Sequence, residues 1–485
     1  MVFSSLEFIY FFVPVFLLLY FLVPMGKRWN VTAANAVLFG GSLFFYASGE
    51  PYYVFLMLAS ILINYYFSYR IAGEKNLSLV GKRRRKRWFR IVVAFDLCML
   101  FLFKYAFFFS HIINQLLFAL GQWAGVELPY LPEVSLVNPV GISFYTFQML
   151  SYVVDVYYRK YAPERNILCM GTYISMFPQL IAGPIVVYPE VREQLHERRV
   201  KAEDFDRGVK TFILGLGAKV LIANRIGLLW TELERLGYES ISTPLAWMGS
   251  WAYSFQIYFD FYGYSLMAVG LGRMLGFRLP DNFRDPYVSR SATEFWHRWH
   301  ITLGRWFKDY LYIPLGGSRK GLLRTLRNIF LVWLFTGLWH GADWNFLIWG
   351  MLFFVLLMVE KIFLGKCLKK LPVLSVPYML LVIPLSWTVF ALSDLKRLGI
   401  YFTRLFPFLP ADYNSNVSRG DWLRYGQTYL LCFICAILLC IPPVKRLLSK
   451  VMRGVPGIIL YLLIFFGSIY FLAQGLDNPF LYYRF

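Results

Sequence analysis

The sequence predicts an all-α, polytopic integral membrane protein. Of its 485 residues, 58% are hydrophobic and 16% are charged, whereas soluble domains are roughly half apolar and a quarter charged. Apolar runs recur from Phe8 to the end of the chain, without a polar block long enough to fold separately. The runs are long and do not alternate with polar residues, which favours helices over a β-barrel. We therefore expect one integral membrane domain over residues 1–485.

The excess of basic residues supports the same class. The formal net charge is +21, and Lys and Arg cluster in short stretches between the apolar runs. This distribution follows the positive-inside rule, whereas a nucleic-acid binder would gather its basic residues on a soluble surface. No nucleic-acid partner is expected. The CxxC at Cys432 and Cys435 lies in an apolar run, which favours helix packing over a disulfide or a zinc site.

The polybasic run Lys82–Arg87 orients the first half of the chain. It lies in a predicted loop, Arg70–Arg90, that would be costly to translocate and is expected in the cytoplasm. Counting the expected spans backward from this loop places Lys27 and Arg28 in the cytoplasm and the N-terminus outside. Met1–Glu7 lacks the basic region of a secretory signal, so the first apolar run should be retained. The expected spans are Phe8–Val23, Ala33–Ala47, Tyr52–Tyr69, Ile91–His111 and Pro139–Tyr158.

The run Ile167–Tyr188 is expected to be re-entrant. It contains Pro178, Gly183 and Pro184 and is followed by basic residues that should stay in the cytoplasm. Broken backbone at membrane depth is tolerated where it is buried or lines a cavity. We therefore expect Phe177–Pro184 to form a cavity wall.

The second half of the chain should contain further spans and two unusual segments. Phe295–Tyr310 is too charged to span and too aromatic for a solvated loop, so it is expected to be an interfacial or re-entrant helix. Asn328–Glu360 has basic flanks at both ends and should fold as a hairpin. For Leu395–Arg424, the only structure that we expect is an amphipathic surface helix. The C-terminus is predicted to lie outside. The remaining expected spans are Thr211–Trp230, Pro244–Leu271, Tyr378–Leu392, Leu430–Ile441 and Ile458–Leu472.

The expected hairpin places His340 near its tip, roughly 20 Å along a 13-residue arm. Ionisable groups inside a membrane are expensive and commonly functional, although a neutral imidazole in a helix crossing is the simpler alternative. His300 lies in the aromatic and basic segment, where an interfacial role competes. His297 and His300 form an HxxH pair, but a third metal ligand is lacking and no metal is expected.

Acyl transfer to a hydroxyl group suits these residues. A neutral imidazole in a dry cavity can remove the proton of the acceptor as its oxygen attacks a thioester. Gly341 would permit a backbone bend, while Asp343 and Asn345 could orient the ring or simply cap the next helix. Basic side chains could meet the phosphates of coenzyme A or the acidic face of a carrier protein, or only anchor the topology. They are Arg284, Arg290, Arg298, Arg305 and Lys308.

Several motifs, taken in order, resemble the membrane-bound O-acyltransferase family, in particular its alginate O-acetylating and teichoic acid D-alanylating branch. They are Asn138–Gln148, Phe177–Pro184, Phe259–Ser265, Asn282–Gly317 and Thr336–Gly341. The Pro314–Gly317 segment and the aromatic end Pro479–Phe485 are more similar to the acetylating members.

The resemblance implies a helical fold with re-entrant segments around a transmembrane tunnel. The family's catalytic histidine falls on His340 and a second histidine on His300, whereas many members have Arg at the position of His297. Supporting roles are expected for Trp299 and Trp339, besides Gly341, Asp343 and Asn345. The donor would pass Arg298, Arg305 and Lys308.

The resemblance further implies a bacterial cell-membrane enzyme without a bound cofactor, which agrees with the extracytoplasmic termini predicted above from the charge pattern. Its cosubstrate would be a cytoplasmic acyl thioester, acetyl-CoA or an acyl carrier protein. The acceptor would be an exported polymer or an extracytoplasmic partner, for which the aromatic C-terminal end would suit docking or membrane anchoring. D-alanyl transfer to teichoic acid, a transporter or flippase for an anionic lipid or polymer, and a non-catalytic scaffold remain alternatives.

Overall fold

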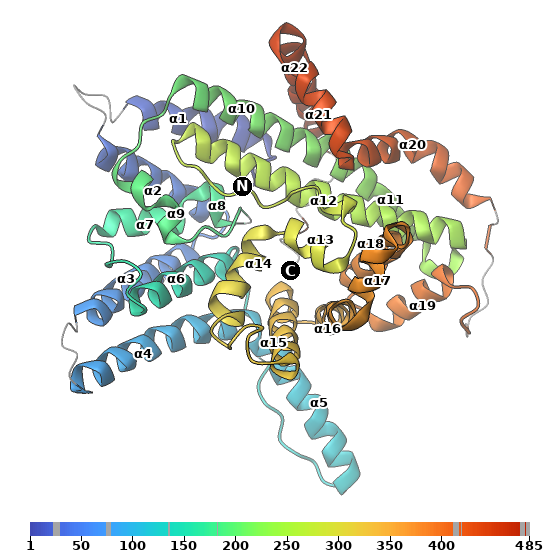
Figure 1. The fold of residues 1–485 in the computed structure, drawn as a ribbon, viewed down its shortest axis with the longest axis horizontal. Coiled ribbons are helices and arrows are strands. Elements are labelled where there is room, and N and C mark those ends of the chain that lie inside the picture. Colours follow the sequence, from blue (N-terminus) through green and yellow to red (C-terminus); the bar gives the residue numbers. More distant parts are fainter. Residues whose placement is uncertain are drawn as a thin grey trace. The chain divides into compact units, whose positions relative to one another are not determined.

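The computed structural model describes residues 1–22, 30–73, 79–133, 136–181, 183–410, 417–418, 420–475 and 481. None of these residues lies in a strand, and helices connected by turns make up the fold (Figure 1). Among the described residues, six helices are long and apolar enough to cross a membrane, or seven if one bent pair counts as a single span. The all-α, multi-pass class is therefore confirmed.

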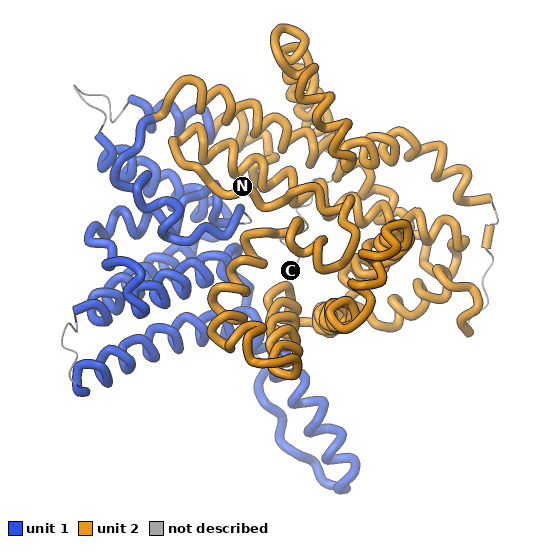
Figure 2. The backbone as a smooth tube through the Cα atoms, viewed as in Figure 1, with its two compact units in different colours: residues 1, 12–199 blue, residues 2–11, 200–485 orange. Residues whose placement is uncertain are grey.

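The described chain forms two compact units (Figure 2). Unit 1 comprises Met1 and Phe12–Arg199, and unit 2 comprises Val2–Phe11 and Val200–Phe485. The expectation of a single domain over residues 1–485 stays a prediction. Lys27, Arg28 and Ala182 lie outside the described residues, as does Pro479–Phe485 except for Leu481.

Among the residues that the structure describes, unit 1 contains nine α-helices after a π-helix, Phe8–Phe12, that the two units share. They are α1 (Val13–Leu22), α2 (Val31–Ala47), α3 (Tyr53–Gly73), α4 (Leu79–Lys104), α5 (Ala106–Ala124), α6 (Ile142–Tyr157), α7 (Ile167–Ser175), α8 (Phe177–Leu180) and α9 (Tyr188–His196).

Two expectations in unit 1 are wrong. The polybasic run Lys82–Arg87 is the first part of α4 rather than a loop, because Lys and Arg are good helix formers whose long side chains can reach water from a helix. The span expected at Ile91–His111 breaks at Tyr105, where α4 and α5 meet at 66°. Helix α5 then continues to Ala124, beyond the end expected for this span.

The segment that is expected to be re-entrant is broken where the sequence predicts. Helix α7 ends before Met176, and Pro178 stands in the first turn of the short helix α8. Phe177 is fully buried against Phe12, Phe16 and Phe45, with ring centroids 5.3, 5.1 and 5.6 Å away. Its backbone N–H donates to the Ser42 hydroxyl at 3.1 Å. The break is thus held by packing on α1 and α2, while its role as a cavity wall stays a prediction.

Unit 2 is built around the long helix α12 (Thr243–Met274), most of which is buried. Helix α10 (Ala202–Gly217) runs through a π-helical turn, Ala218–Ala223, into α11 (Asn224–Leu236). The other helices are α13 (Ala292–Arg298), α14 (Ile301–Phe307), α15 (Leu322–His340), α16 (Trp344–Val359), α17 (Gly365–Lys370), α18 (Ser375–Ala391), α19 (Leu395–Leu405), α20 (Asp421–Cys440), α21 (Pro442–Val451) and α22 (Gly454–Ala473). The short helices α13 and α14 replace the single interfacial helix expected over Phe295–Tyr310.

Glycines bring α10 and α12 into backbone contact. A Cβ atom at Gly215 would lie 2.4 Å from the Gly263 carbonyl oxygen, and one at Gly263 would lie 2.5 Å from that of Gly215. Small residues of this kind let membrane helices approach closely. At the same crossing, the buried side chains of Lys219 and Asp260 form an ion pair. Asp260 also accepts a hydrogen bond from the Leu481 backbone N–H at 3.0 Å. This bond holds Leu481, which is close to the last residue of the sequence, against α12.

The basic stretch that begins at Leu395 contains the expected amphipathic helix. Leu398, Tyr401 and Leu405 of α19 are buried, and the Tyr401 hydroxyl donates to the Ala246 carbonyl of α12 at 2.7 Å. On the exposed side, Arg397 forms an ion pair with Glu234 of α11 at 3.3 Å. The segment thus packs against other helices of unit 2. All six cysteines have free thiols, including Cys432 and Cys435 of the CxxC sequence.

Candidate active site

His340 is the last residue of α15, directly before the turn into α16. Close approach of the two arms requires glycine in α15 and in the turn: a Cβ atom at Gly337 would lie 2.5 Å from the Phe346 carbonyl oxygen. A Cβ atom at Gly341 would lie 2.1 Å from the Phe346 ring. The predicted hairpin, with His340 near its tip, is therefore confirmed.

Aromatic side chains surround the His340 imidazole. Its ring is edge-on to Trp339, Trp349 and Phe390, with centroids 5.0, 5.0 and 5.2 Å away and interplanar angles of 79°, 84° and 83°. Only 3% of the residue is exposed. The imidazole is thus enclosed by aromatic side chains and shielded from bulk water.

His300 stands at the break between α13 and α14, outside the candidate membrane spans. Its backbone is left-handed, with φ at 45°, and it is buried. Its Nδ1 atom lies 3.0 Å from Asn282 Oδ1, which also accepts the Thr302 backbone N–H at 3.3 Å and the Thr302 hydroxyl at 2.9 Å. Because this Asn282 oxygen is an acceptor, Nδ1 must carry the proton and Nε2 the lone pair.

Burial keeps His300 neutral. It lowers the pKa of the imidazole from about 6.5 to about 3, because a charged ring without water is poorly solvated. At neutral pH, His300 is therefore a neutral imidazole with Nε2 as its acceptor.

Trp339 connects the two histidines that the sequence singled out. The centroid of its indole lies 5.0 Å from that of His340 and 5.8 Å from that of His300. Phe261, from the predicted Phe259–Ser265 motif, packs edge-on against His300 at 4.8 Å. Trp299 packs against Trp387, with ring centroids 4.7 Å apart. Residues far apart in sequence thus converge on one aromatic cluster.

Asp343 and Asn345 have identifiable structural partners. Asp343 accepts the Trp344 backbone N–H at 2.7 Å and is the N-cap of α16. Asn345 donates its amide to the Phe390 carbonyl at 2.8 Å. Within the described part of the chain, buried Asn345 Oδ1 and Trp349 Nε1 have no hydrogen-bond partner. Buried polar atoms of this kind are commonly satisfied by water or a ligand.

The residues expected to bind the donor do not gather in one place as the residues around the two histidines do. Arg298 forms an ion pair with Glu294 at 2.7 Å, Arg305 of α14 is partly exposed, and Lys308 is exposed. Glu294 and the exposed His297 line an open pocket of about 740 Å³ in unit 2, together with Glu360 and four basic residues. These are Arg290, Lys361, Lys366 and Lys369.

For three residues of the site the sequence predicted no role: Asn282, Trp349 and Phe390. Asn282 was part of a recognised motif, but its bond to His300 depends on a fold that joins positions 18 residues apart. Trp349 and Phe390 resembled ordinary residues of apolar spans. His297 is exposed and His300 buried, and the described residues of the HxxH pair do not form part of a three-ligand metal cluster.

Comparison with known proteins identifies the chemistry that this fold supports. The model of the membrane-bound O-acyltransferase family matches residues 164–370, a range that includes both histidines. The probable alginate O-acetylase AlgI of Pseudomonas aeruginosa is 37% identical over 84% of this chain and 75% of its own. The peptidoglycan O-acetyltransferase of Helicobacter pylori is 34% identical over 74% and 70%. The teichoic acid D-alanyltransferase of Bacillus subtilis is 29% identical over 50% and 63%.

Proposed function

The chain belongs to the membrane-bound O-acyltransferase family, and from this premise we propose that it transfers acetyl groups to hydroxyls of an exported polymer. It is a multi-pass membrane O-acyltransferase. The relatives with 34 to 37% identity are named as O-acetylating proteins, whereas the D-alanyltransferase is 29% identical over half of this chain. This difference favours acetyl over D-alanyl as the transferred group. We place the protein in the bacterial inner membrane.

The observation that carries the proposed mechanism is the packing of His340 and His300 on one indole, Trp339. His340 takes the proton of the acceptor hydroxyl while the oxygen attacks the carbonyl carbon of the thioester. The tetrahedral intermediate collapses, the carbon–sulfur bond breaks, and the thiolate leaves and receives the proton from His340. General base catalysis of this kind contributes about 10²- to 10⁴-fold in rate.

His300 is assigned the orientation of the acceptor. With Nδ1–H committed to Asn282, its Nε2 atom can accept a hydrogen bond from a substrate hydroxyl but cannot donate one. Trp349 Nε1 and Asn345 Oδ1 provide a buried donor and acceptor near His340 for other polar groups of the substrates. Acyl transfer in this family needs no metal cofactor.

The basic pocket is assigned to the donor. Arg290, Lys361, Lys366 and Lys369 can pair with phosphates, and coenzyme A and the phosphopantetheine arm of a carrier protein both carry them. Arg298 acts here through its ion pair with Glu294, which lines the pocket. We propose acetyl-CoA or an acetylated carrier protein as cytoplasmic donor, and either a polymer or an extracytoplasmic acyltransferase as acceptor.

This function is tested by mass spectrometry of the polymers exported by cells that carry either the wild-type protein or one of its variants. We expect acetylation with the wild-type protein and its loss with His340→Ala and His300→Ala at equal protein levels. His111→Ala is the matched control, because this exposed histidine lies outside both the aromatic cluster and the donor pocket. Normal acetylation in the His340→Ala cells would contradict the proposal, and donor-independent polymer or lipid movement in proteoliposomes would favour a transporter.

A further inference from the structure

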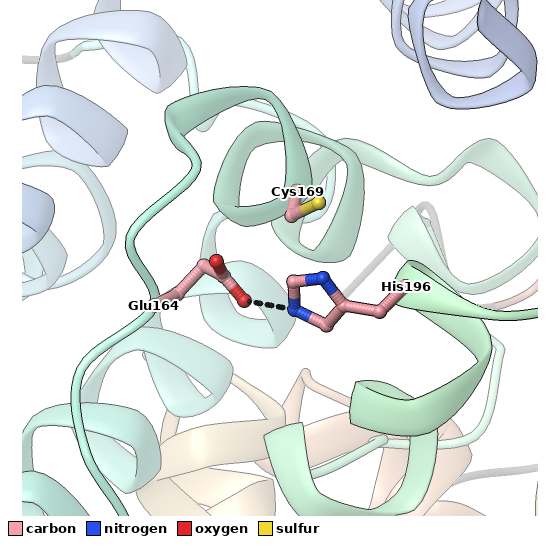
Figure 3. Close-up of side chains that lie close together, drawn as sticks. All are labelled: Glu164, Cys169 and His196. Carbon is pink, nitrogen blue, oxygen red and sulfur yellow. Dashed lines mark hydrogen bonds and ion pairs between the residues drawn. The ribbon is translucent and has the colours of Figure 1, made fainter. Parts of the chain in front are cut away.

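Glu164, Cys169 and His196 form a cluster in unit 1 that takes no part in the proposed reaction (Figure 3). Glu164 precedes α7, Cys169 lies in α7, and His196 is the last residue of α9. One carboxylate oxygen, the thiol sulfur and one imidazole nitrogen lie within 4.8 Å of one another. The His196 ring points between the other two side chains, with Nε2 2.8 Å from Glu164 Oε2.

The carboxylate and the thiol are held in place before any ion binds. Glu164 Oε1 accepts the Asn166 backbone N–H at 2.8 Å, and Oε2 accepts the Tyr188 hydroxyl. The Asn35 amide donates to Cys169 Sγ at 3.5 Å.

We propose that Glu164, Cys169 and His196 bind a zinc ion, with water as the fourth ligand. Thiolate, imidazole and carboxylate are the zinc ligands of proteins, whereas Mg²⁺ and Ca²⁺ prefer oxygen alone. Ligand atoms of a tetrahedral zinc site lie about 3.4 to 3.6 Å apart, given metal–ligand lengths of 2.0 to 2.3 Å. The His196 side chain is 48% exposed and can move to reach this geometry. Tyr188 and Asn35 then act as the outer partners that orient the ligands.

A catalytic cysteine is a poorer interpretation of the same cluster. Cys169 is 2% exposed, and its thiol donates to the Leu195 carbonyl at 3.8 Å. A bulky acyl thioester could not reach this sulfur, whereas an ion next to the exposed His196 could. Binding releases the thiol proton to solvent, so the affinity should rise with pH.

The ion would connect the two ends of the re-entrant region. Glu164 precedes α7 and α8, and His196 follows them, 32 residues later in the sequence. Closing a loop of this length restricts the unfolded chain. Zinc is therefore expected to stabilise unit 1 rather than to enter the acyl-transfer reaction.

Zinc content of the full-length protein, purified in detergent, tests the site. After loading with zinc and desalting, elemental analysis should find roughly one ion per chain. The cobalt-loaded protein should show a sulfur-to-cobalt charge-transfer absorption. Cys169→Ser should remove this absorption, and both Cys169→Ser and His196→Ala should lose the retained ion. Tyr188→Phe, which keeps all three ligands, should weaken binding by about 10- to 100-fold.

Two matched controls separate this site from surface binding. Cys98→Ser changes an exposed cysteine outside the cluster. His111→Ala breaks an exposed ion pair between a histidine and a glutamate, and among the described residues no cysteine joins this pair to form a three-ligand cluster. Both should retain the ion. Equal zinc retention by His196→Ala, or no zinc in the loaded wild-type protein, would overturn the proposal. His196→Ala removes an exposed ring, so it keeps the test valid if Cys169→Ser does not fold.

Discussion

At the scale of single residues, the surroundings of an imidazole decide which chemistry it can perform. Asn282 Oδ1 fixes the tautomer of His300, while burial keeps the ring neutral. His340 lies among aromatic faces at the end of α15. At neutral pH, His300 can therefore accept a hydrogen bond through Nε2, while the His340 ring is held in an aromatic enclosure.

Asn282→Asp should change the pH dependence of the reaction. The pKa of His300 is about 3, so its protonation should not limit the wild-type enzyme in the neutral or mildly acidic range. A carboxylate about 3 Å from Nδ1 stabilises the imidazolium and raises this pKa. Activity should then fall at a higher pH than in the wild type, because the charged ring can no longer accept at Nε2.

The turnover rate measured against pH, with saturating donor and acceptor, checks this expectation. Thr302→Val is the matched control, because it removes one donor to Asn282 without adding a charge. Superimposable acid limbs for Asn282→Asp and wild type would refute the role given to Asn282.

At the scale of helices, close backbone approach positions the site. The α10–α12 crossing depends on Gly215 and Gly263, and the hairpin tip depends on Gly337 and Gly341. Helix α12 then supplies Phe261, which packs on His300. A change at the crossing should therefore reach the site through α12.

Gly263→Ala should destabilise the protein. Its Cβ atom would lie 2.5 Å from a carbonyl oxygen of α10, and overpacking of this kind costs about 1 to 3 kcal/mol. The thermal midpoint in detergent should fall. Gly399→Ala in α19, where no atom lies within 4 Å of the new Cβ, should not lower the midpoint. Equal midpoints for both variants would show that the crossing is looser than the structure indicates.

At the scale of the whole molecule, the membrane topology determines which substrate reaches which side. Oriented by the positive-inside rule, the run Lys82–Arg87 should face the cytoplasm although it is helical. Glu127 follows α5 and should face outside. The donor and acceptor would then approach from opposite sides of the membrane.

Cysteine labelling of intact spheroplasts tests this topology. In a background with Cys98 and Cys367 replaced by Ser, Glu127→Cys should react with a membrane-impermeant maleimide. Lys82→Cys should react only after permeabilisation. The reverse pattern would invert the proposed orientation and place the assigned donor pocket outside.

Local patterns predicted the helical class, the break at Pro178 and the hairpin tip at His340, because apolar length, proline and polar interruption act within a few residues. The helical form of Lys82–Arg87 could not be predicted in this way, because a dense run of charges is also typical of loops. The bend at Tyr105 could not be predicted either, because no proline or glycine marks it in the sequence. Asn282 and Phe390 could not be assigned from the sequence, since their roles depend on contacts between distant segments. The Glu164 cluster escaped for the same reason.

Chemical rescue tests the central claim, that the His340 imidazole removes the proton of the acceptor. In acyl transfer by the purified protein with a thioester donor and a polymer fragment, His340→Ala should be slower by about 10²- to 10⁴-fold. Added imidazole should restore part of the rate, in proportion to its unprotonated fraction. Wild-type transfer by a folded His340→Ala protein without imidazole would contradict the account.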